Sequence, residues 1–201
     1  MKIIITAVLI LFAGVCKAQT PVYDITDYHN RAQDVYGAYH KDMNNLLNPF
    51  EGTYIYTNGN TSLKIVLQKK IMSSMNGYVY EDLIIGEYQY IENGIEKANT
   101  LNKLLINYAN GWKYNIVSNH IITQGDIGCK DCLQNEKALM GGLIDGASEN
   151  TAQLTIRRVT DNNLPAIKIF ILWRMTQRSE NTPASPHASI PGGSYTLIKQ
   201  P

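Results

Sequence analysis

Hydrophobic and polar residues alternate along the chain from Gly52 onward. A tyrosine-rich run over residues 53–57 ends at Asn58-Gly59, and the alternation resumes over residues 62–68. A period of two is typical of a strand with one buried face. Asn-Gly between two such runs is the strongest short hairpin signal, because both residues accept a positive φ. Residues 52–68 are therefore predicted to form an antiparallel hairpin.

The same alternation recurs in the rest of the chain, with further Asn-Gly turns at residues 93–94 and 110–111. No helical pattern separates these runs, which argues against a parallel α/β sheet. We predict an all-β fold for residues 52–201, a single antiparallel barrel or sandwich of about eight to nine strands. After the first hairpin, the predicted strands cover residues 78–91, 95–106, 112–116, 138–144, 152–157, 167–174 and 195–199.

Two segments differ from this pattern. Residues 19–51 precede the β domain, and their apolar positions between Asp27 and Leu47 recur at helical spacing. They are predicted to form a short helical or irregular lead-in. Residues 177–193 are rich in proline, serine and glycine, and we expect a long mobile loop there.

Residues 1–18 have the three parts of a secretory signal. A lysine is followed by an uncharged apolar run over residues 3–15, and the Ala18-Gln19 junction places a small residue before the cut. The apolar run is shorter than the ~20 residues that span a bilayer, which favours cleavage over a retained anchor. Cys16 lacks the preceding residues of a lipidation signal. We expect a periplasmic or secreted protein with no transmembrane segment after cleavage.

Charge and composition exclude one class of partner. Removal of Lys2 and Lys17 with the signal reduces the 18 basic residues to 16, against 17 acidic residues. The resulting net charge of about −1 argues against nucleic acid, because such binding needs a basic face. An apolar fraction of 44% can form a hydrophobic core.

The remaining cysteines form the short motif Cys129-Lys130-Asp131-Cys132. Outside the cytoplasm such a pair is expected to form a disulfide, with a redox-active pair and a zinc site as the alternatives. A redox pair requires a βαβ unit, which the pattern does not contain. Zinc requires further ligands, and the histidines are scattered, so no metal is predicted. They are His29, His40, His120 and His187.

Catalytic motifs are missing from the sequence. It contains no Gly-x-Ser-x-Gly, His-Glu-x-x-His or phosphate-binding glycine loop. Glu81-Asp82 and Glu87 share a predicted strand, and we interpret them as part of a solvated face. We therefore predict no catalytic residue and no cofactor, and a hydrolytic enzyme is the least favoured class of function.

The aromatic residues suggest a different kind of site. Thirteen tyrosines and two tryptophans outnumber three phenylalanines, and a cavity lined by such rings could hold an apolar or sugar-like ligand. The alternative is cross-strand pairing that only stabilises the sheet. Arg157-Arg158 and Arg174 could together bind a carboxylate or phosphate, or pair with surface acids. The predicted ligand-binding residues are Tyr54, Tyr56, Tyr88, Tyr90, Trp112, Tyr114, Trp173 and Arg174.

Two family resemblances add to this interpretation. Residues 46–54 resemble the entry to a lipocalin-type barrel, with Tyr54 at the position of that family's tryptophan on the first strand. The resemblance implies an arginine packed over this ring, for which Arg174 is the candidate. The chain also resembles a family of short secreted proteins of unknown function from Bacteroidetes-type bacteria, which implies export from a Gram-negative cell but no activity. This second resemblance rests on Ala18-Gln19, residues 48–54, Glu87-Tyr88-Gln89-Tyr90 with Asn99-Thr100-Leu101, and Leu197-Ile198-Lys199-Gln200-Pro201.

The expected function is that of an exported, non-enzymatic, lipocalin-like β-domain that binds a small apolar or amphipathic ligand. The alternative is a structural or surface-interaction module without a small-molecule site, whose aromatic residues would form an exposed patch. The sequence predicts neither the ligand nor the oligomeric state.

Overall fold

The computed structural model describes residues 20–27, 35–74, 77–174 and 187–201. Eight antiparallel strands form a closed barrel in the order β5-β4-β3-β11-β10-β9-β8-β7, and β7 pairs again with β5. Closure decides between the two predicted architectures in favour of the barrel. Its strands are β3 (Gly52–Asn58), β4 (Thr61–Ser74), β5 (Tyr80–Glu92), β7 (Ile116–Ile122), β8 (Ala138–Ile144), β9 (Thr151–Asp161), β10 (Leu164–Trp173) and β11 (Gly193–Lys199).

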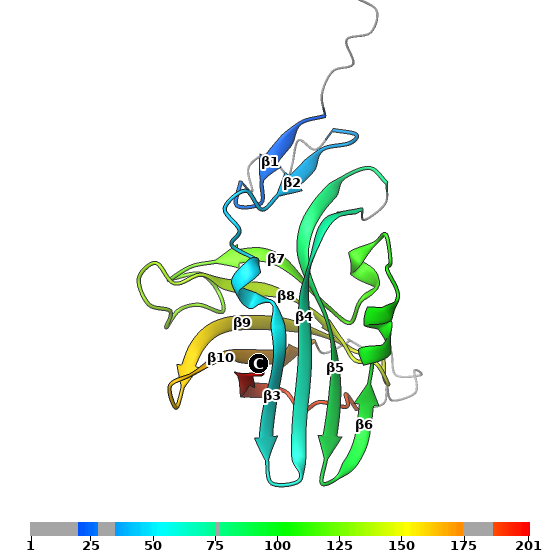
Figure 1. The fold of residues 1–201 in the computed structure, drawn as a ribbon, viewed down its shortest axis with the longest axis vertical. Coiled ribbons are helices and arrows are strands. Elements are labelled where there is room, and N and C mark those ends of the chain that lie inside the picture. Colours follow the sequence, from blue (N-terminus) through cyan, green and yellow to red (C-terminus); the bar gives the residue numbers. More distant parts are fainter. Residues whose placement is uncertain (1–19, 28–34, 75–76, 175–186) are drawn as a thin grey trace, which may run out of the picture.

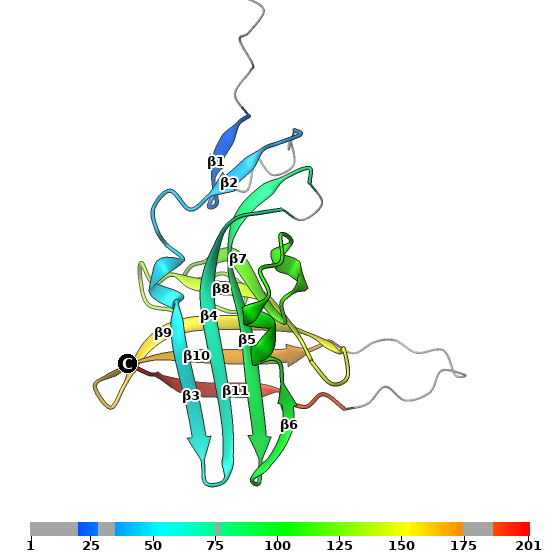
Figure 2. The ribbon, with the colours of Figure 1, turned by 45° about the vertical axis from the view of Figure 1, so that its right-hand side comes forward.

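The two halves of the barrel cross at a steep angle, as Figures 1 and 2 show for β3–β5 against β9 and β10. One end, which we call the hairpin end, carries the β3–β4 turn at Asn58-Gly59 and the turn after β5 at Asn93-Gly94. Positive φ values at Gly59, Asn93 and Gly94 confirm both predicted Asn-Gly turns. The opposite end, which we call the η2 end, is covered by the 3-10 helix η2 (Asn48–Phe50).

The free edge of β5 pairs with three partners in turn. Residues 80–81 pair with β2 (Tyr39–Lys41), residues 84–86 with β7, and residues 89–92 with β6 (Ile95–Asn99). Because each partner takes only part of β5, this strand extends beyond the barrel at the η2 end, together with β4 (Figure 1).

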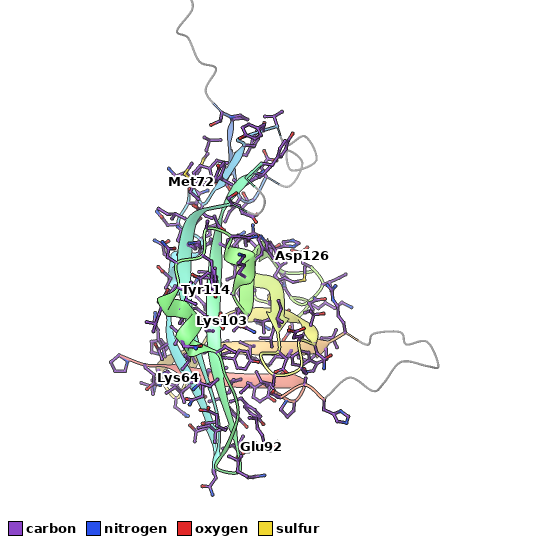
Figure 3. All side chains as sticks on the ribbon, turned by 90° about the vertical axis from the view of Figure 1, so that its right-hand side faces the viewer. Lys64, Met72, Glu92, Lys103, Tyr114 and Asp126 are labelled. Carbon is purple, nitrogen blue, oxygen red and sulfur yellow. A yellow bond between two sulfur atoms is a disulfide. The ribbon has the colours of Figure 1, made fainter. Side chains whose placement is uncertain are left out.

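The predicted strands over residues 95–106 and 112–116 are mostly wrong. After β6 the chain forms the 3-10 helices η3 (Leu101–Leu105) and η4 (Gly111–Lys113) on the outside of the barrel. A small apolar cluster of Leu83, Ile85, Tyr114 and Val117 fastens this segment to the wall. Figure 3 labels Lys103 and Tyr114 in this segment.

The predicted helical lead-in is also wrong where the structure describes it. Instead of a helix, β1 (Val22–Asp24) and β2 form a parallel pair that extends the sheet at β5. Two buried acids explain the docking of this segment. Asp82 accepts hydrogen bonds from the Tyr39 hydroxyl (2.6 Å) and the Asp42 amide (3.0 Å), and Asp42 accepts from the Lys69 ammonium (2.8 Å). Residues 28–34 of the predicted helix lie outside the described residues.

The core fills the barrel with inward-facing residues. On β4, for example, Leu63, Ile65 and Leu67 are buried in one cluster with Leu154 of β9 and Ile169 of β10. The predicted signal and residues 177–186 of the predicted loop lie outside the described residues. In the described part of the chain, no helix is long and apolar enough to cross a membrane.

Candidate functional site

The eight residues predicted to bind a ligand do not form one site. Tyr54, Tyr88 and Tyr90 are buried in the barrel core, and Tyr56 and Trp173 pack against it. Tyr114 belongs to the cluster outside the barrel, and Trp112 and Arg174 are exposed on the outer surface. The predicted residues therefore fall into two separate groups, one in the interior of the barrel and one on its outer wall.

Several of the interior rings use their polar atoms to hold the protein itself together. The Tyr54 hydroxyl donates to the Phe50 carbonyl at 3.0 Å, and the Trp173 indole N–H donates to the Ile190 carbonyl at 2.9 Å. Burial raises the pKa of the Tyr54 hydroxyl, which therefore stays protonated and remains a donor. These contacts match the structural alternative for the buried aromatic residues.

The hairpin end is closed by a fully buried carboxylate, Asp145. It accepts hydrogen bonds from the Tyr88 hydroxyl (2.9 Å) and from the amide and hydroxyl groups of Ser148 and Ser189. Burial alone would raise the pKa of Asp145, but bonds from Ser148, Tyr88 and Ser189 lower it below its ordinary value. These protein groups satisfy both oxygens of the carboxylate, so we interpret Asp145 as a structural residue.

The η2 end carries an open pocket of about 610 Å³. It is lined by apolar residues of η2 and the barrel strands and by three cationic side chains. We call it the η2 pocket, and its lining residues are Pro49, Tyr54, Leu133, Glu136, Arg157, Arg158, Val159, Thr160, Pro165, Ala166 and Lys199.

Two of these cations are held over aromatic rings. The Arg158 guanidinium lies 5.6 Å from the centre of the Phe50 ring, and the Lys199 ammonium lies 5.8 Å from the centre of the Tyr54 ring. Such contacts position a cation without neutralising it. Among the described residues, neither cation forms a salt bridge.

The third cation, Arg157, is neutralised by the loop that precedes β8. Its guanidinium binds Glu136 (Nε to Oε1, 2.8 Å) and Asp131 (Nη1 to Oδ2, 2.9 Å). The hydrogen bond to Arg157 holds the pKa of Glu136 below its ordinary value. The disulfide Cys129–Cys132, which confirms the predicted pairing, closes this loop. Arg157 is thus paired, and the excess positive charge of the pocket belongs to Arg158 and Lys199.

The assignment of Arg174 to the ring of Tyr54 is wrong. Lys199 covers that ring, because β11 pairs with β3 and places Lys199 opposite Tyr54. Arg174 follows the end of β10, where its amide donates to Thr151 at the hairpin end of the wall. Because Arg174 lies at the hairpin end, it does not cluster with Arg157 and Arg158, which lie at the η2 end.

The sequence contains a signal that could have identified the two free cations. Arg158 shares the inward face of β9 with Leu154 and Ile156, and Lys199 shares the inward face of β11 with Leu197. A charged residue that ends an inward-facing apolar row indicates the position at which the barrel opens to water.

The acids interpreted as a solvated face are buried. Glu81, Asp82 and Glu87 are at most 8% exposed, because η3, η4 and the lead-in cover this part of β5. Glu81 accepts the Trp112 indole N–H at 2.8 Å and the Asn119 amide at 2.5 Å. Asp82 holds the lead-in, as described above. The fold therefore uses Glu81 and Asp82 as fixed acceptors.

In the described parts of the chain, no group of three or more His, Cys, Asp or Glu is placed to hold a metal ion. The geometry defines a class of protein: a closed eight-stranded antiparallel barrel with a hydrophobic core. The chain belongs to the family of unknown function DUF6705, whose model matches residues 1–200. Comparison with curated proteins and with solved structures gives no significant match.

Proposed function

We propose that this protein is an exported, non-enzymatic barrel that binds a small amphipathic anion in the η2 pocket. The observation that carries the proposal is a pair of cations, Arg158 and Lys199, that form no salt bridge with any described residue and line a partly apolar pocket. An anionic head group would bind the two cations, and its apolar part would cover Tyr54, Pro49 and Ala166. The predicted signal and the disulfide are both compatible with export.

The pocket favours an anion with an apolar tail over either component alone. Two exposed cations attract a small inorganic anion only weakly, because water screens the charges. A purely apolar molecule would leave both charges at its edge. A carboxylate or phosphate on a short alkyl chain satisfies both parts of the pocket, and its volume of about 610 Å³ is in the range of small-molecule sites.

Isothermal titration calorimetry tests this proposal, with dodecanoate and dodecyl phosphate below their micelle concentrations and dodecanol below its solubility limit. Both anions should bind and the neutral alcohol should not. Arg158→Met and Lys199→Met should each weaken binding about tenfold, because each removes a charged partner of the head group.

Lys113→Met is the matched control. The Lys113 ammonium also lies 5.8 Å from a tyrosine ring, that of Tyr108, but on the outer segment instead of in the pocket. This variant should bind dodecanoate as the wild type does. Equal binding of dodecanol and dodecanoate, or an unchanged affinity in the Arg158→Met/Lys199→Met double variant, would contradict the proposal.

A further inference from the structure

A second site lies on the outer wall, away from the η2 pocket. Two pockets of about 200 and about 310 Å³ share Trp112, Val117 and Arg174 and form one groove across β7, β8 and β9. We call it the Trp112 groove. Besides the shared residues, its polar lining includes Asn119 and Gln153.

The indole of Trp112 is both exposed and fixed, which is unusual for a surface tryptophan. The residue is 42% exposed, yet its indole N–H is bound to Glu81 at 2.8 Å and its backbone N–H to Asn110 at 2.9 Å. Glu81 is itself held by Asn119. A fixed ring loses little conformational entropy when a ligand stacks on it.

The segment that carries Trp112 is also fixed to the wall. The Gly111 amide donates to the Ser73 hydroxyl at 2.8 Å, and a Cβ at Gly111 would lie 2.3 Å from the Leu83 side chain. Only glycine lets η4 approach the barrel this closely. The position of the indole is therefore set by backbone contacts as well as by Glu81.

The floor of the groove is open at one position. Gly142 on β8 pairs with Val117 on one side and with Gln153 on the other, so these three residues form a row across the wall. A Cβ added at Gly142 would meet no atom within 4 Å. The space that a side chain would occupy at Gly142 is thus available to a ligand beside Trp112.

The geometry points to a saccharide as the ligand of the Trp112 groove. A sugar ring has an apolar C–H face that stacks on an indole, and hydroxyl groups at its edge that bind planar side chains. Arg174 and Gln153 supply such side chains. A fully apolar ligand would gain less here, because the groove lies on the outer surface and would leave much of its area in water. This site is independent of the proposed function of the η2 pocket.

Titration calorimetry with maltohexaose, cellohexaose and xylohexaose at millimolar concentrations tests the inference. We expect at least one of these to bind the wild type, with a change in tryptophan fluorescence. Trp112→Ala should weaken that binding at least tenfold, and Trp112→Phe, which keeps a ring but loses the bond to Glu81, should weaken it less.

Gly142→Val separates loss of the groove from loss of the fold. Valine favours strands and its Cβ would meet no atom within 4 Å, so the urea midpoint should not fall below the wild-type value while saccharide binding is lost. The Arg158→Met/Lys199→Met variant should bind saccharide normally, so the two proposed sites can fail separately. Absence of binding to all three hexasaccharides, or wild-type affinity in both Trp112→Ala and Gly142→Val, would overturn the inference.

Discussion

The two ends of the barrel differ in how their charged side chains are surrounded. At the hairpin end, Asp145 is completely buried and accepts hydrogen bonds from Tyr88, Ser148 and Ser189. At the η2 end, Arg158 and Lys199 are exposed, lie over aromatic rings and form no salt bridge with any described residue. One end satisfies its charge internally, and the other presents its charge to the solvent.

This difference separates structural polar groups from those available to a ligand. A buried charge is tolerated only when protein groups satisfy it, so the network of Asp145 is needed for folding. Exposed cations over rings contribute little to stability, and the fold does not need them at these positions. The comparison therefore predicts large effects on stability at one end of the barrel and effects on binding at the other.

The largest expected effect is that of Asp145→Ala. Removing the carboxylate leaves the buried Tyr88 hydroxyl and the part-buried amides of Ser148 and Ser189 without this acceptor, which should cost about 4 kcal/mol of unfolding free energy. Urea denaturation followed by tryptophan fluorescence measures the loss, because Trp173 lies at the same end of the barrel and donates to Ile190.

Asp126→Ala is the matched control for this prediction. Asp126 accepts hydrogen bonds from the amide (2.7 Å) and the hydroxyl of Thr123, as Asp145 does from Ser148, but it is exposed. Figure 3 labels it on the loop that follows β7. Its removal should cost less than about 1 kcal/mol. Equal losses in the two variants would show that burial does not distinguish the two ends.

The strands of this barrel could be predicted because their signal is local. Alternation over residues 62–68 and Asn-Gly at two hairpins depend only on neighbouring residues. The third Asn-Gly pair, Asn110-Gly111, forms no hairpin, because contacts of Gly111 with distant Leu83 and Ser73 place it in η4. The lead-in forms strands for a similar reason, since Tyr39 pairs with Tyr80 and binds Asp82.

The candidate site was only partly predictable. The sequence indicates Arg158 as part of an arginine cluster. It does not indicate the aromatic partner Phe50, which lies more than a hundred residues earlier in the chain. Lys199 was not identified, because its contact with Tyr54 depends on the pairing of the last barrel strand with the first. Closure of a barrel is a long-range event, and the periodicity of single strands does not encode it.

The second prediction concerns the disulfide at the η2 end. Cys129→Ala/Cys132→Ala should lower the unfolding free energy by roughly 2 kcal/mol, the amount that the chain-entropy model gives for so short a loop. Reduction of the wild type should produce a similar shift of the urea midpoint. If the double variant lost more unfolding free energy than Asp145→Ala, the stability of the barrel would depend more on the η2 end than on the hairpin end, contrary to this comparison.

The smallest expected effect is that of a substitution at Glu87, which lies outside both ends. It tests whether a buried carboxyl elsewhere in the protein also needs hydrogen bonds from protein groups to stay charged. The Glu87 side chain is completely buried beneath the segment that follows β6. One oxygen accepts the Asn115 amide at 3.0 Å, and the other has no hydrogen-bond partner among the described residues. Burial raises the pKa of Glu87, although the neighbouring Thr100 hydroxyl, the Asn115 amide and the charge of Lys103 partly offset this shift. Unlike Asp145, this carboxyl has one oxygen without a donor among the described residues, so it keeps its proton to a higher pH in the folded protein than in the unfolded chain.

The sign of the pH dependence follows from that shift. A carboxyl whose pKa is raised on folding contributes its full stability below its unfolded pKa of about 4.3, and loses this contribution as the pH rises through the folded pKa. Asp145, whose pKa is lowered, contributes above its unfolded pKa and loses its contribution as the pH falls. The unfolding free energy of Glu87→Gln, relative to the wild type, should therefore increase between pH 4 and pH 7. Glu92→Gln, on the same strand but 40% exposed beside Lys97, is the matched control for the chemistry of the substitution at each pH. The contrary result is an unfolding free energy of Glu87→Gln that changes with pH as that of the wild type does. The number of hydrogen-bond donors around a buried carboxyl would then not predict the direction of its pKa shift in this protein.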